Sequence, residues 1–198
     1  MTDLSIVFNR AADLGNADVV VGAAYTLHKA TFDALAPFPV LLLEKDRAEF
    51  TPQKTLVARA GDRVAGCALL IEIGKIQPLL GAIAGKFGQA AADKMREADL
   101  LFDPNKPVFE IGSISVDPAF RNKGIARGLY ETAALHAGRN IYAIITRDNG
   151  ASRAAAKAAG FQAIANSVHT VHFTLEGGRA RPCLSGSYEV QAEIFRPA

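Results

Sequence analysis

The stretch VDPAFRNKGIARGLY, which begins at Val116, combines residue types that can bind a phosphate group. A strand-like segment ends at Val116 and is followed by a proline turn, basic residues, and Gly124 at the expected start of a helix. The first amide groups of a helix have no intrahelical partners, and a glycine lets an anion approach them closely. The same pattern is also typical of a capped surface helix with solvated basic residues. The basic residues are Arg121, Lys123 and Arg127.

The composition predicts one folded domain and argues against several classes of partner. The chain has 198 residues, of which 49% are hydrophobic and 21% charged, as in soluble globular proteins. Its 22 basic residues are scattered and the formal net charge is +2, so we expect no nucleic-acid partner. The apolar stretches are too short to span a membrane, and the first residues do not resemble a secretory signal. Cys67 and Cys183 lack the neighbours of a zinc site or redox pair, which favours buried thiols in a reducing, cytoplasmic setting.

Strand and helix patterns alternate in a way that predicts a mixed sheet with helices on both faces. The turn at Gly61 and Asp62 joins two strand-like segments into a hairpin, which argues against a wholly parallel sheet. Residues 74–107 have helical periodicity broken by glycines and predict a helical insertion. The stretch GGRARPCLSGS is turn-rich and separates two late strands. Strands are expected over LSIVF, TLVARA, RVAGCALLIEI, PVFEIGSISV, IYAIITR, SVHTVHFTL and SYEVQAEIF, and helices over residues 17–35, GIARGLYETAALHAGRN and ASRAAAKAA, the last two ending near Gly138 and Gly160.

Two motifs together resemble the GNAT superfamily of acyl-CoA N-acyltransferases. The stretch VDPAFRNKGIAR resembles motif A, in which an R/Q-x-x-G-x-G/A loop holds the CoA pyrophosphate, with Arg121, Gly124 and Ala126 at the signature positions. The stretch ITRDNGASRAAAKAAGFQAI resembles motif B, which is a strand, an asparagine, a short helix and then Gly-Phe. The resemblance implies an α/β (α+β) fold with a mixed, splayed central sheet flanked by helices on both faces. It also implies a single domain over residues 1–198 with a helical insertion at about 74–107.

The resemblance further implies an N-acetyltransferase that moves an acetyl group from acetyl-CoA to a primary amine of a small molecule or peptide. The amine would attack directly in a ternary complex, and a backbone amide near Val116 would meet the charge that develops on the thioester oxygen. No metal is expected, because the four histidines lack metal-ligand spacing. The implied cofactor-binding residues are Ile114, Ser115, Val116, Arg121, Asn122, Lys123, Gly124, Ile125, Ala126, Arg127, Asn149 and Ser152.

Glu110 is the candidate general base. An alkyl ammonium has a pKa near ~10, so a base must remove its proton before the amine can attack at neutral pH. Glu110 lies at the entry to the motif A strand, a placement that resembles the catalytic glutamate of the family's histone acetyltransferase branch. The alternative is a surface carboxylate at the start of a strand. In a regular strand Glu110 would share a face with Ile114 and Val116, and the bulge usual in this family would change that count.

One departure from the family concerns the general acid. Many members carry a tyrosine on the motif B helix to protonate the departing thiolate, and Ala156 stands at that position here. Tyr142, Tyr130, Ser152 or water could supply the proton, and the acid stays unassigned. The departure also motivates an alternative function, a non-catalytic acyl-CoA binding or sensing module. The acceptor matches no recognised pattern, and the chain length and family habit are compatible with a homodimer.

Overall fold

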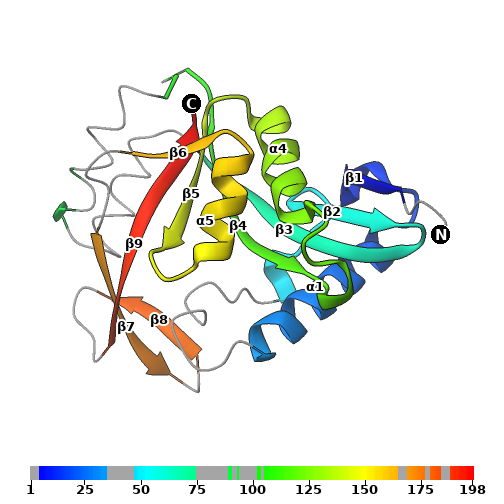
Figure 1. Ribbon diagram of the computed structural model, residues 1–198, viewed down its shortest axis with the longest axis horizontal. Coiled ribbons are helices and arrows are strands. Elements are labelled where there is room, and N and C mark those ends of the chain that lie inside the picture. The colour runs from blue at the N-terminus through cyan, green and yellow to red at the C-terminus, as the bar shows by residue number, and fades with distance from the viewer. Residues whose placement is uncertain are drawn as a thin grey trace. The chain divides into compact units, whose positions relative to one another are not determined.

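A computed structural model describes most of the chain as two compact units. The described residues are 5–34, 47–74, 89–90, 93, 102–103, 105–164, 169–176, 179–183 and 188–198. The first unit comprises residues 1–71 and 111–136, and the second comprises residues 72–110 and 137–198 (Figure 1). Most of the predicted insertion at 74–107 lies outside the described residues. The single domain over residues 1–198 stays a prediction, and each unit is described by itself.

The strands of the first unit follow the order β1-β2-β3-β4. β1 pairs antiparallel with β2, and β2 pairs antiparallel with β3. Gly61 joins β2 to β3 with a φ of +61°, a conformation that favours glycine. The predicted hairpin is therefore confirmed. The strands are β1 (Ile6–Arg10), β2 (Thr55–Ala60), most of β3 (Arg63–Gly74) and the second part of β4 (Val108–Val116).

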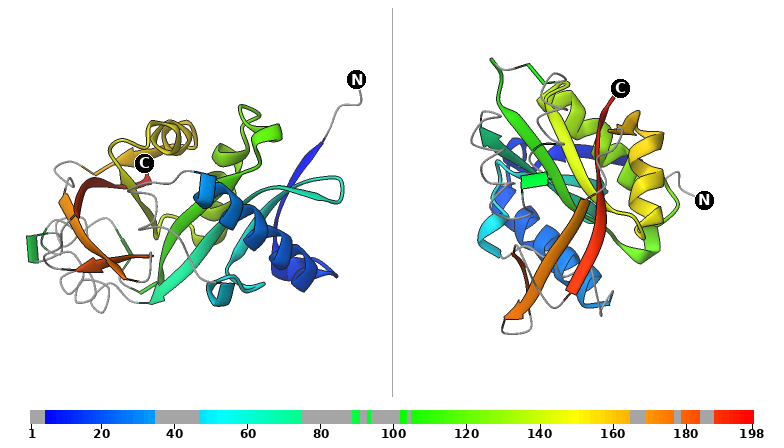
Figure 2. Two further views of the ribbon diagram at one scale, coloured as in Figure 1. Left: turned by 90° about the horizontal axis from the view of Figure 1, so that it is seen from below. Right: turned by 90° about the vertical axis from the view of Figure 1, so that its left-hand side faces the viewer.

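Two helices cover opposite faces of these strands (Figure 2). Successive side chains of β3 point to opposite faces. Cys67 and Leu69 belong to a buried cluster with Val20, Val21 and Ala24 of α1 (Ala17–Ala34). Gly66 faces α4 (Ile125–Ala137), because a Cβ at this position would lie 2.5 Å from the Ile125 side chain. The predicted arrangement of helices on both faces is present in this unit.

The second unit contains both parallel and antiparallel strand pairs. β5 pairs parallel with β4 and antiparallel with β9, and β9 also pairs with β6 and β7. β8 pairs with β7 and occupies part of the stretch predicted as turn-rich, so that prediction is wrong for residues 179–183. The elements are β5 (Ile141–Thr146), α5 (Gly150–Ala158), β6 (Phe161–Ala163), β7 (His169–Glu176), β8 (Arg179–Cys183) and β9 (Tyr188–Pro197).

Glycines end both motif helices as the sequence predicts. Gly138 follows α4 with a φ of +63°, and Gly160 follows α5 with a φ of +82°. A residue in this left-handed conformation stops a helix and lets its last carbonyl groups find partners. In the part of the chain that the structure describes, no helix is long and apolar enough to cross a membrane.

Candidate active site

The motif A loop is built on Asp117, which follows β4 directly. One of its carboxylate oxygens accepts a hydrogen bond from the Ala119 amide at 2.9 Å and so caps a 3-10 turn at Pro118–Phe120. The other oxygen accepts from Arg63 Nη2 at 2.7 Å. The Asp117 amide donates to the Ala65 carbonyl oxygen of β3 at 3.0 Å. These contacts hold the loop on the end of the sheet, and the carboxylate is only 15% exposed.

The backbone after this turn carries a run of consecutive amide groups. Asn122 and Gly124 have φ values of +62° and +77°, which turn the chain sharply before α4. No described residue accepts a hydrogen bond from the amides of Asn122 to Arg127, whereas the Gly128 amide donates to the Gly124 carbonyl oxygen at 2.9 Å. Successive amides in such a turn and at a helix N-terminus form a concave site suited to an anion.

The basic residues around these amides differ in the contacts that their side chains make within the protein. Lys123 Nζ and the Arg63 guanidinium carbon each lie 5.2 Å from the centre of the buried Phe120 ring, which is a cation–π arrangement. Arg121 is exposed. Arg127 Nε is 2.7 Å from Glu131 Oε1 on the next turn of α4, so that ion pair partly neutralises its charge. Arg63 was not among the residues that the sequence pointed to, because the residue after a hairpin turn carries no motif.

The Ser115 side chain faces the core. It is 1% exposed, and its Oγ lies 3.3 Å from Nδ1 of the fully buried His28 on α1. Cys67 belongs to the same buried group: its thiol donates to the Ala24 carbonyl oxygen at 3.3 Å, and burial raises its pKa to about 12. Only the backbone of Ser115 is therefore available to a ligand. A thiol that stays protonated at neutral pH is also a poor nucleophile.

One residue of β4 has an unusual backbone conformation. Ser113 has a φ of +55°, which is rare for a residue with a side chain. From Ile111 onward, buried and half-buried residues alternate, so Ile114 and Val116 lie on the face opposite Ser115. Glu110 is half-buried and fits this alternation, whereas the half-buried Phe109 and the buried Val108 do not.

Glu110 lies in the second unit and contacts Tyr142. The two residues are direct partners in the parallel register of β4 and β5. Tyr142 Oη donates to Glu110 Oε2 at 3.0 Å. The phenol is 1% exposed, and burial followed by the nearby carboxylate raises the pKa of Tyr142 well above its usual value. The sequence named both residues but did not indicate this contact.

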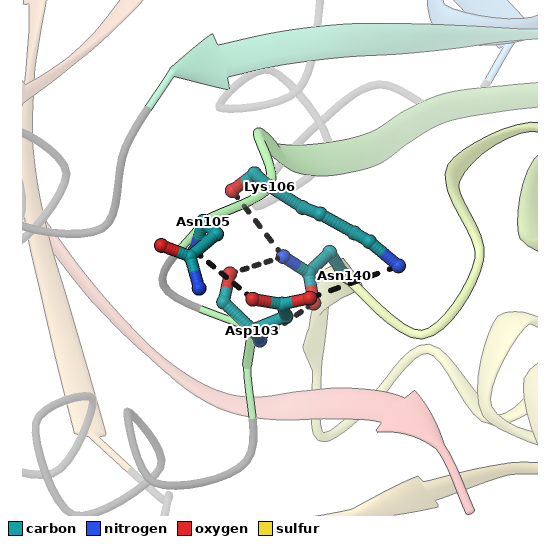
Figure 3. A network of polar contacts seen from close by, with 4 residues as sticks. All are labelled: Asp103, Asn105, Lys106 and Asn140. Carbon is teal, nitrogen blue, oxygen red and sulfur yellow. Dashed lines mark hydrogen bonds and ion pairs between the residues drawn. The ribbon is translucent and has the colours of Figure 1, made fainter.

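A polar network around Asn140 holds the two strands in this register (Figure 3). Asn140 Oδ1 accepts from the Asp103 amide at 2.9 Å, and Nδ2 donates to the carbonyl oxygens of Asp103 at 2.8 Å and Lys106 at 3.3 Å. The Asn140 carbonyl oxygen accepts from the Phe109 amide at 2.8 Å. Asn140 is 3% exposed, so the start of β5 is tied to the segment that enters β4. Nothing in the sequence pattern singled out Asn140.

The motif B residues lie at the start of α5 in the second unit. Asn149 caps the helix, since its Oδ1 accepts from the Ser152 amide at 3.1 Å. Arg153 forms a 2.8 Å ion pair with Glu193 of β9. Ala156, at the position where many family members have a tyrosine, is fully buried. Asn149 and Ser152 are half-buried, and a role in cofactor binding stays a prediction for both.

Two of the comparisons with known proteins point to acetyltransferases. The model of the acetyltransferase (GNAT) family matches residues 22–161. A search of curated proteins found no match. The chain is similar in structure to Arabidopsis thaliana NAA60 in complex with acetyl-CoA, with a TM-score of 0.57, 14% identity and 97% of each chain covered. It is also similar to the Drosophila melanogaster polyamine N-acetyltransferase, with a TM-score of 0.52, 15% identity, and 97% of this chain and 99% of that chain covered. For the ribosomal-protein-alanine N-acetyltransferase from Brucella melitensis, the TM-score is 0.53 at 16% identity, with 98% of each chain covered.

Proposed function

Because the chain belongs to the acetyltransferase (GNAT) family, we propose that it is an N-acetyltransferase that uses acetyl-CoA to acetylate a primary amine. The acceptor is a small molecule or a peptide. The observation that carries the proposal is the run of amides from Asn122 to Arg127, for which no described residue provides an acceptor. A diphosphate supplies the oxygen atoms that such donors bind.

The residues of the motif A loop fit the cofactor in charge as well as in hydrogen bonding. Arg121 and Lys123 are exposed beside the amides, and neither is ion-paired with a described acidic residue. They would neutralise the negative charge of the diphosphate, while Gly124 lets the phosphate oxygens approach the backbone. Bound acetyl-CoA would supply an acetyl thioester, which is an acyl group activated for transfer to an amine.

The protein's own contribution to the chemistry is removal of a proton from the acceptor. Only about one alkylamine molecule in a thousand is unprotonated at neutral pH, given a pKa near ~10. Glu110 is half-buried, and its side chain offers a carboxylate oxygen to an incoming ammonium, directly or through water. Cys67 takes no part, because its buried thiol stays protonated. We therefore propose direct attack by the amine without an acyl-enzyme.

The proteins of similar structure guide the choice of acceptors for the experiment. They include a polyamine N-acetyltransferase, an agmatine N-acetyltransferase and two ribosomal-protein-alanine N-acetyltransferases. The panel is accordingly spermidine, agmatine and a short peptide with a free N-terminal alanine. Release of free CoA thiol is measured from acetyl-CoA with each amine and corrected for hydrolysis without amine. We expect saturable, amine-dependent release with at least one member, and mass spectrometry of that product should show one added acetyl group.

Glu110→Gln provides the matched control, because it keeps the shape of the side chain and removes the base. Loss of a positioned base lowers rates by roughly 10²- to 10⁴-fold. Saturable acetyl-CoA binding with no release for any amine would instead support the alternative, a non-catalytic acyl-CoA binding or sensing module. The absence of a tyrosine at Ala156 is the feature that favours that alternative.

A further inference from the structure

Tyr142 is a buried phenol whose hydroxyl donates to the Glu110 carboxylate. Its hydroxyl donates to Oε2 at 3.0 Å, and no described residue donates to Oε1. A hydrogen bond to a charged acceptor is stronger than one between neutral groups. It also restricts the carboxylate to one rotamer, because the donor is fixed. The two oxygens of Glu110 are thus unequal, since one is occupied and the other can still accept a proton.

The surroundings of Tyr142 fix its ring as well as its hydroxyl. Phe102 packs against it edge to face, with ring centres 6.4 Å apart. Arg196 covers Phe102, with its guanidinium carbon 5.8 Å from the ring centre. The Asn140 network sets the register that makes Tyr142 the direct partner of Glu110 (Figure 3). The packing of the ring and the register of the strands therefore both fix the position of the hydroxyl that contacts Glu110.

The same geometry makes Tyr142 a poor proton donor to a leaving thiolate. Its proton is already shared with Glu110, and the phenol is 1% exposed. Loss of that proton would leave a buried phenolate beside a carboxylate, and like charges in a poorly solvated site repel strongly. The sequence had left Tyr142 open as a candidate acid, and the contact with Glu110 favours another role.

We propose that Tyr142 is a positioning residue for Glu110: it holds Oε2 and so directs Oε1 to take the proton from the amine. This inference rests on the proposed function, in which Glu110 is the base. The proton passes from the ammonium nitrogen to Oε1, and the phenol keeps its own proton throughout. No oxidant, metal or covalent intermediate is involved in this step.

A double-mutant cycle tests the inference. Wild type, Tyr142→Phe, Glu110→Gln and the double variant are compared with acetyl-CoA and the panel amine that gives the highest kcat/KM. We expect Tyr142→Phe to lower kcat about tenfold, the effect of losing one hydrogen bond to a charged group, with the KM for acetyl-CoA within about twofold of wild type. In the Glu110→Gln background the same change should have no further effect, because the carboxylate that it positions is gone.

Ile141→Val is the matched control for loosening of β5. Ile141 is fully buried on the same strand and pairs with Phe109, so the variant removes a methyl group from the core without altering the hydroxyl. Its kcat should match wild type although its melting temperature falls. Thermal unfolding of all variants shows whether each is folded at the assay temperature.

Three results would overturn the inference without refuting acetyl transfer. The first is a Tyr142→Phe enzyme with wild-type kcat, and the second is the same tenfold loss in the Glu110→Gln background. The third is a fully active Glu110→Gln enzyme, which refutes the positioning role while leaving acetyl transfer itself intact. If wild type releases no CoA with any amine, the proposed function fails, and the inference fails with it.

Discussion

Gly124 is the residue of the motif A loop at which a substitution separates backbone geometry from charge. Its φ is +77°, which glycine adopts without strain and which asparagine and aspartate tolerate better than most residues. A Cβ placed there would meet no atom within 4 Å. A side chain at position 124 would therefore fit the folded protein and extend into the space where a diphosphate is proposed to bind.

Gly124→Asp should weaken acetyl-CoA binding far more than Gly124→Asn, because the two side chains have the same shape and only one repels phosphate. We expect the Asp variant to bind at least about tenfold more weakly than the Asn variant, which corresponds to ~1.4 kcal/mol. Titration calorimetry with acetyl-CoA measures both affinities, and circular dichroism confirms that both variants fold. Equal affinities for the two variants would refute the proposal that a diphosphate binds at this loop.

At the scale of elements, the sequence predicted the turns and helix ends that depend on the backbone conformation of a single residue. The hairpin turn at Gly61 and the helix ends at Gly138 and Gly160 all have the positive φ that glycine supplies, so single residues indicated them. β8 was missed because RARPC contains a proline and two arginines, and such residues are typical of a turn. β6 has only three residues and offers no periodicity to detect.

The contacts of the candidate site depend on register, which a single sequence does not reveal. Glu110 and Tyr142 were both identified, yet their hydrogen bond requires the parallel pairing of two strands that are separated by a helix. The contact of Ser115 with His28 likewise joins residues that are 87 positions apart in the sequence. The residue types were therefore predictable, whereas the partners of these side chains came only from tertiary structure.

Asn140 allows a prediction about one such tertiary contact. Asn140→Ala removes three hydrogen bonds and leaves the Asp103 amide without its side-chain acceptor, so it should lower the free energy of unfolding by roughly 2–4 kcal/mol. Asn140→Asp keeps the acceptor and loses only the two donor contacts, and should destabilise the protein too. Urea unfolding followed by circular dichroism measures both. Wild-type stability of the Ala variant would show that the network does not hold the strands in register.

At the scale of the whole molecule, cofactor binding depends on local charge and is linked to the stability of the folded state through mass action. The chain has a formal net charge of only +2, so attraction of a polyanionic cofactor depends on local groups such as Arg121 and Lys123. A ligand that binds the folded state alone stabilises it by an amount set by its concentration and its dissociation constant. Melting temperature therefore reports on cofactor binding even when no acceptor is known.

Acetyl-CoA at one hundred times its dissociation constant should stabilise the wild-type protein by about 2.7 kcal/mol. For a chain of this length that corresponds to a rise in melting temperature of roughly 5–11 °C. Differential scanning calorimetry over a series of acetyl-CoA concentrations should show the shift growing with the logarithm of concentration, and added salt should reduce it by screening the phosphate contacts. The Gly124→Asp variant, scanned at the same concentrations, should show little or no shift, because its binding is impaired while its fold is kept. A wild-type melting temperature that stays constant across the series would mean that the folded chain does not bind acetyl-CoA, whatever the geometry of its loop.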